Sequence, residues 1–254
     1  TWLKVPESFK IKLTGNASRG AVPKDIILYI IGRMTADGAT YKAVEFHGPA
    51  VEKMDIAGRM TICNMSAEMG AKAAMVPFDD ITEQWLKDAG AEDFHPLFAD
   101  EDAEYEKTLE IDVSEITPQV AKPHKVDNVV SVSELEETRI DVALLGTCTN
   151  GRLEDLREAA EVLDGRMIKP GVRLLVYPAS RKVMRQAEKE GLIGKLLDSG
   201  AQIAVPACGP CLGAYGGVLA PGENCVSTAN RNFKGRMGCR EDTGVYLASP
   251  ATVA

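Results

Sequence analysis

The sequence lacks the features of a membrane, secreted or nucleic-acid-binding protein. No apolar run approaches the roughly 18 residues that cross a bilayer, and the first residues lack the apolar core of a signal peptide. Lys and Arg number 29 against 37 Asp and Glu, a net charge of -8, which disfavours nucleic acid as the main partner. The chain also lacks an initiator Met, and we expect it to begin inside a longer protein.

Cysteine and histidine are scarce as well. Six cysteines in 254 residues are too few for a disulfide-stabilised scaffold, so free thiols or metal ligands in the cytoplasm are predicted. The three histidines show no metal-binding spacing and are predicted to be structural or exposed: His47, His95 and His124. What is present, 45% hydrophobic and 26% charged residues, is the composition of a globular protein with a sizeable core.

The second half of the sequence alternates apolar runs of strand length with amphipathic segments. Strands are predicted over residues 140–146, 171–178 and 201–207, and helices over 153–163 and 180–200. This alternation is typical of βαβ units, in which helices cover both faces of a parallel sheet.

The first half shows the same elements less regularly. It predicts a helix, a strand and a second helix in turn, over residues 23–34, 39–46 and 54–76. Residues 82–126 are acidic and interrupted by proline, which predicts a surface connection. We therefore expect an α/β fold of two α/β domains, each with a mainly parallel sheet covered by helices, spanning residues 1–125 and 126–254.

Three cysteines follow predicted strands directly. Cys148 comes after the strand at 140–146, whereas Cys208 and Cys211 come after the strand at 201–207. Ligands of open parallel sheets bind beyond the carboxyl ends of the strands. The three thiols are therefore predicted at one edge of one sheet, in loops rich in Gly, Thr and Asn that can direct backbone N–H groups at a negative centre.

Four interpretations of these thiols stay open from the residues alone. A thioredoxin-like redox motif needs a helix directly after Cys-Gly-Pro-Cys, and the Leu-Gly-Ala-Tyr-Gly-Gly that follows is a poor helix start. A structural zinc site usually needs four ligands, and only one Cys-x-x-Cys pair is present. Buried free thiols are the third interpretation. The favoured one is a [4Fe–4S] cluster with three Cys ligands and one open, Lewis-acidic iron.

Four segments resemble the signature segments of the aconitase superfamily, and within it the large subunits of the 3-isopropylmalate dehydratase and homoaconitase group. They are GTCTNGR (146–152), ACGPCLG (207–213), NRNFKGRMG (230–238) and MTICNMSAEMGA (60–71). The resemblance extends over nearly the whole chain. It implies that Cys148, Cys208 and Cys211 hold the cluster and that three amides form hydrogen bonds near it: Asn64, Asn150 and Asn230.

The resemblance also implies substrate and catalytic residues. Glu68 would lie beside the open iron and contact the hydroxyl or water that leaves and returns, while Arg231 and Arg236 would bind substrate carboxylates. The chemistry agrees, because Asn64 and Glu68 are four residues apart on one predicted helix face and arginine binds carboxylates through two parallel hydrogen bonds. The remaining cysteines are predicted to be core residues or free thiols: Cys63, Cys225 and Cys239.

The implied activity is a hydro-lyase that interconverts 3-isopropylmalate and 2-isopropylmalate in leucine biosynthesis. Homoaconitase and 2,3-dimethylmalate dehydratase are alternatives, and a cluster-free RNA-binding relative or a thiol redox protein are remote ones. The implied partner is a small subunit that carries the catalytic serine base, in a heterodimer or heterotetramer that acts on a small di- or tricarboxylate.

Two parts of such an enzyme do not occur in this sequence. The histidine and aspartate motifs of the family's first domain, of the kind His-Asp-His and Asp-Ser-His-Thr, are missing, and so is the domain that carries the serine. We therefore expect this chain alone to be inactive, and its cluster to be absent or degraded when the chain is isolated.

Overall fold

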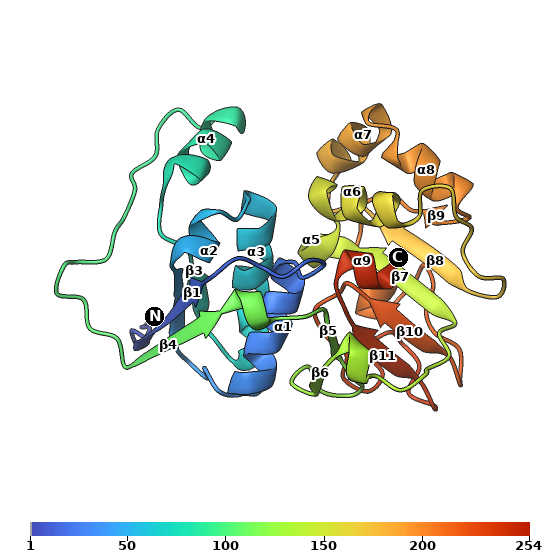
Figure 1. Cartoon of the computed structure of the whole chain (residues 1–254), viewed down its shortest axis with the longest axis horizontal. Coiled ribbons are helices and arrows are strands. Elements are labelled where there is room, and N and C mark those ends of the chain that lie inside the picture. The colour runs from blue at the N-terminus through green and yellow to red at the C-terminus, as the bar shows by residue number, and fades with distance from the viewer. Residues whose placement is uncertain (1) are drawn as a thin grey trace.

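The computed structural model describes residues 2–254 and arranges them around two β-sheets (Figure 1). The first sheet has four parallel strands in the order β3-β2-β1-β4. Phe9, Ile11 and Leu13 are buried and alternate along β1 with more exposed residues, so this strand buries one face. The strands are β1 (Ser8–Thr14), β2 (Ala43–His47), β3 (Ala73–Met75) and β4 (Lys107–Asp112).

The helices of the first half are α1 (Pro23–Met34), α2 (Pro49–Glu52), α3 (Ile56–Met65), the 3-10 helix η1 (Ser66–Met69) and α4 (Asp80–Asp88). The predicted helix over 23–34 is confirmed. Pro23 is its first residue, and the Asp25 carboxylate accepts a hydrogen bond from the Val22 backbone N–H at 3.0 Å. Both features are typical of a helix start.

Two predictions for the first half are wrong in part. The helix expected over 54–76 ends at Met69, because Gly70 turns the chain with a φ of 87°, and Ala73–Met75 then pairs with β2. The acidic region, expected to be a surface connection, contains α4 and β4. Ile111 is the one buried residue of β4, so this edge strand has almost no apolar pattern in the sequence.

The second sheet has seven strands in the order β6-β5-β11-β10-β7-β8-β9. Five are parallel, and β5 and β6 join one edge in antiparallel pairs. The strands are β5 (Gln119–Ala121), β6 (Val129–Ser131), β7 (Val142–Gly146), β8 (Arg173–Tyr177), β9 (Gln202–Ile203), β10 (Asn224–Ser227) and β11 (Gly244–Leu247). The chain crosses from the first sheet to the second in the segment that joins Asp112, the end of β4, to Gln119, the start of β5. A domain boundary near residue 125 stays a prediction.

Most predicted elements of the second half are present. The predicted strands at 140–146 and 171–178 correspond to β7 and β8, whereas the third predicted strand is reduced to the two residues of β9. The helices are α5 (Thr147–Asn150), α6 (Leu153–Val162), α7 (Arg181–Lys189), α8 (Leu192–Asp198) and α9 (Pro250–Val253), with 3-10 helices η2 (Val113–Glu115), η3 (Val132–Glu134) and η4 (Gly209–Leu212).

The two faces of the second sheet are buried against different partners. Ala143 and Leu145 of β7 pack in one core with α6, α8 and α9. Val142 and Leu144 belong to a second core, which is continuous with that of the first half. Helix α1 lies between the two sheets (Figure 1). Within residues 2–254, no helix is both long and apolar enough to span a membrane.

Candidate functional site

The first cysteine loop begins where β7 ends. Gly146 has a φ of 133°, and a Cβ there would lie 2.1 Å from the Tyr177 carbonyl oxygen, so only glycine fits at this close approach. Its N–H donates to Thr228 Oγ1 at 2.8 Å. Two residues later, in α5, Cys148 is exposed beside the buried Thr149.

The second cysteine loop follows β9 and contains η4. Cys208 is exposed and Cys211 is buried. Tyr177, the last residue of β8, donates from its hydroxyl to the Gly216 carbonyl at 2.7 Å, and its ring packs directly against Gly209. Tyr177 therefore contacts both cysteine loops, and no pattern in the sequence distinguishes it from the other residues of its strand.

The Cys211 thiol is affected by the charges around it. Burial raises the pKa of the Cys211 thiol, the Arg236 guanidinium lowers it, and negative charge on Cys148 and Cys208 raises it further. Arg236 Nη2 lies 3.6 Å from Cys211 Sγ. Across residues 2–254, no three Cys, His, Asp or Glu side chains converge on a single metal ion. Thiolates that bind different irons of one cluster do not need to share an ion.

Glu68 is the centre of a second group of polar side chains. Its carboxylate accepts hydrogen bonds from Arg231 Nε at 2.9 Å and from Asn230 Nδ2 at 3.1 Å. The Glu68 side chain is 10% exposed, and this burial raises its pKa, against the opposing effect of Arg231, Arg236 and Lys24. Asn64 lies on α3, whereas Glu68 lies on the 3-10 helix η1 that follows it directly. The two residues were predicted on one α-helix, and the structure places a more tightly wound turn between them.

Arg236 connects these two groups. It reaches Cys211 through Nη2 and stacks its guanidinium 5.5 Å from the centre of the Phe233 ring. Its positive charge also acts on Glu68. Arg236 Nε is buried and has no hydrogen-bond partner among the residues described, so a donor remains available next to the sulfur.

Two of the three predicted amides form hydrogen bonds at the first cysteine loop, and Asn150 is itself the last residue of α5. Asn64 Oδ1 accepts from Thr149 Oγ1 at 3.3 Å, while Asn150 Nδ2 donates to Asp155 Oδ1 at 2.9 Å and to Thr61 Oγ1 at 3.3 Å. Two buried oxygens of this loop have no partner among residues 2–254, Thr147 Oγ1 and Asn150 Oδ1. The loop is thus fixed to α3 and α6 while retaining unused polar atoms.

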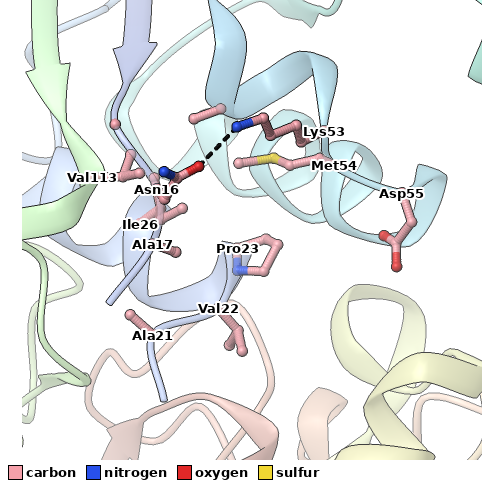
Figure 2. Close-up of a pocket in the computed structure, with 12 residues that line it drawn as sticks. Asn16, Ala17, Ala21, Val22, Pro23, Ile26, Lys53, Met54, Asp55 and Val113 are labelled. Atoms are coloured by element: carbon pink, nitrogen blue, oxygen red, sulfur yellow. Dashed lines mark hydrogen bonds between the residues drawn. The ribbon is translucent and has the colours of Figure 1, made fainter. Parts of the chain in front are cut away.

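A cavity of about 290 Å³ lies apart from these groups. It is bounded by the end of β1 and the start of α1, where Lys53 Nζ donates to Asn16 Oδ1 at 2.8 Å (Figure 2). None of the predicted site residues lines it. The candidate site is therefore the loop region around Glu68, Arg236 and the cysteines.

A sequence model of the aconitase family (aconitate hydratase) matches residues 1–254. The chain belongs to the aconitase family. It is 52% identical over 254 residues to a protein of Archaeoglobus fulgidus named 3-isopropylmalate dehydratase large subunit 2, covering all of this chain and 61% of that relative. It is also 52% identical over 253 residues to a probable methanogen homoaconitase large subunit of Methanosarcina mazei, of which it covers 64%.

The chain thus spans about 60% of the length of these family members. Among solved structures, the fold resembles that of Thermococcus kodakaraensis aconitase X, with a TM-score of 0.51 at 15% identity. The match covers 89% of this chain and 49% of that one. At this identity the likeness concerns the fold alone, and it agrees with the predicted helix-covered α/β sheets.

Proposed function

We propose that this chain is the part of a hydro-lyase large subunit that binds the substrate and an iron–sulfur cluster. The proposed reaction is the interconversion of 3-isopropylmalate and 2-isopropylmalate through loss and return of water. Homoaconitate is the alternative substrate, since large subunits of both names are 52% identical to this chain.

One observation carries the proposal: Arg231 binds the buried Glu68 carboxylate, and Arg236, from the same loop, contacts Cys211 and acts on Glu68 through its charge. This arrangement supports a site that binds an anionic acid beside sulfur ligands, in a protein whose net charge of -8 would otherwise repel such a substrate.

The three cysteines are the proposed cluster ligands. Cys148, Cys208 and Cys211 would hold a [4Fe–4S] cluster, which when bound supplies a Lewis-acidic iron for the oxygens of a hydroxy acid. The unpartnered Thr147 hydroxyl and Arg236 Nε are hydrogen-bond donors beside these cysteines, and donors of this kind stabilise the negative charge of cluster sulfurs.

The remaining chemistry falls to side chains of this chain. Arg231, whose side chain is 44% exposed, and Arg236 would bind the two carboxylates of the substrate. Glu68, a buried carboxyl whose pKa is raised by that burial and lowered by the nearby cations, would exchange the proton with the departing and returning hydroxyl. Arg231 Nε fixes the orientation of Glu68 during that transfer.

The proton next to the substrate carboxylate needs a base, which we assign to a small-subunit partner. The relatives in this group are named as large subunits, and the names support a partner of this kind. The chain by itself is therefore expected to lack steady turnover, and steady conversion of isopropylmalate without any partner would contradict the assignment.

The experiment is anaerobic reconstitution of the full-length large subunit with iron and sulfide. Wild-type protein and Cys239→Ser are expected to gain absorbance near roughly 400 nm, because Cys239 is a separate free thiol, whereas Cys148→Ser loses it. Equal iron content in both variants would exclude Cys148 as a ligand.

Substrate choice is tested by kcat/KM of the enzyme assembled with its small subunit. We expect isopropylmalate to exceed homoaconitate and dimethylmalate, by a factor within the 10–200-fold that alkyl pockets usually provide, about 1–3 kcal/mol. A preference for homoaconitate would establish the alternative.

A further inference from the structure

Lys24 has no solvent-exposed surface. Among the charged residues that the structure describes, it is the largest side chain that is fully buried. It is the second residue of α1, and a cation near a helix N-terminus is opposed by the helix dipole. Burial adds a desolvation penalty, which lowers the pKa of Lys24 to about 8. The position is therefore unfavourable for a lysine unless its contacts compensate.

Those contacts are all at the candidate site. The Lys24 ammonium donates to the Thr228 carbonyl and to the Ala229 carbonyl, both at 2.8 Å, and to Met65 Sδ at 3.8 Å. Its three N–H donors are thus used by two segments that are distant in the sequence. One segment leads into Asn230 and Arg231, and the other lies on α3 directly after Asn64.

Thr228 extends this network to the first cysteine loop. Its Oγ1 accepts from the Gly146 N–H at 2.8 Å and lies 3.2 Å from the carbonyl oxygens of both Gly146 and Asn150. One ammonium therefore holds a backbone segment that contacts the Cys148 loop on one side and precedes Arg231 on the other.

We infer that Lys24 is a positioning residue, which holds residues 228–231 against the α3–η1 segment so that Asn230 and Arg231 meet Glu68. The inference rests on the proposed function for its catalytic consequence, but the placement of the loop can be tested without it. Lys24 touches neither the Glu68 carboxylate nor a cysteine sulfur at hydrogen-bond distance, and it acts through the backbone that carries Arg231.

The first test is limited trypsin digestion of the full-length protein. Lys24→Met keeps the length and burial of the side chain but removes its donors. We expect it to accelerate cleavage after Arg231, Lys234 and Arg236 about 10-fold, and cleavage within α7 not at all. Lys53→Met removes an exposed lysine that donates to Asn16 and to no other residue among 2–254; it is the control and should change neither rate.

Unchanged cleavage at residues 231–236 in Lys24→Met would overturn the inference, whatever the protein catalyses. Equal acceleration at α7 would also overturn it, since the effect would then be global destabilisation. Lys24→Gln, which retains two N–H donors, should give an intermediate rate. If both variants fail to fold, Lys24 is a folding requirement and the positioning role is wrong.

The second test is a double-mutant cycle in the assembled, iron-loaded enzyme. Lys24→Met should lower kcat roughly 100-fold at unchanged iron content, because small displacements of reacting groups cost about this much. In a Glu68→Gln background the same change should cost less than about 3-fold, since the group that it positions is already lost. Equal factors in both backgrounds would overturn the inference, whereas a wild-type enzyme without activity would reject the proposed function instead.

Discussion

The two halves of the molecule present their site residues in different ways. The first half carries Asn64 and Glu68 on the continuous turns of α3 and η1. The second half carries Cys148 and Cys211 on the single turns α5 and η4, inside the loops that follow β7 and β9, and its arginines in the loop after β10. A helix fixes the direction of a side chain through its own backbone hydrogen bonds, whereas a loop needs contacts with other loops.

Close backbone contacts provide that support in the second half. Gly213, two residues after Cys211, has a φ of 78°, and a Cβ there would lie 2.7 Å from the Gly238 nitrogen, two residues after Arg236. The second cysteine loop and the arginine loop are therefore in contact through the backbones of two glycines. The difference between the halves predicts that the helical groups tolerate small changes in packing better than the loops do.

The two halves share a continuous core, and substitutions in it should cost the most stability. Leu28→Ala in α1 and Leu144→Ala in β7 each remove a fully buried side chain and should lower the free energy of unfolding by about 2–5 kcal/mol. Because both belong to one cluster, both should shift the same single transition in chemical denaturation. Separate transitions, one for each variant, would show that the halves unfold independently. Leu197→Ala, at a site 52% exposed, is the control.

The next effect tests the loop contact itself. Gly213→Ala combines an unfavourable φ with the contact at Gly238, whereas Gly222→Ala has a similar φ of 82° and nothing within 4 Å. Both should lose about 1–2 kcal/mol of stability from the φ alone, and Gly213→Ala should lose more and also bind less iron after reconstitution. Equal stability and iron content in the two variants would refute the role of the close approach.

The smallest effect concerns a side-chain anchor in the first half. Arg59 donates to both Asp79 oxygens, at 2.7 and 2.6 Å, and lowers the pKa of Asp79 to about 2. Because its pKa is lowered, Asp79 stabilises the folded state at pH values above its ordinary pKa of 3.8. This stabilisation is lost as the pH falls toward 2. Because Asp79 is partly solvated, we expect Asp79→Asn to cost about 1 kcal/mol at neutral pH.

That cost is measured as the difference in the free energy of unfolding between wild type and Asp79→Asn. It should shrink between about pH 4 and pH 2. A difference that grows toward low pH would have the wrong sign for this ion pair. Asp164→Asn, which removes a surface pair with Lys195, should change stability by no more than about 0.5 kcal/mol.

Prediction from the sequence succeeded where periodicity or a start signal was strong. The α1 boundaries follow from Pro23 and the apolar repeat, and β7 follows from its continuous apolar run. It failed at β4 and β3, because edge strands with one buried residue or none resemble polar loops. The roles of the predicted site residues stay predictions, although Glu68, Asn230 and Arg231 do lie in hydrogen-bond contact.

Local patterns and short segments were enough to predict the α/β class, the main parallel strands and the cysteine and arginine loops. The folded arrangement was needed to establish that Lys24 is buried, that Tyr177 contacts both cysteine loops and that Arg236 reaches Cys211. These contacts join residues far apart in the chain. A local pattern has no information on such distances, whereas packing two sheets around α1 fixes them.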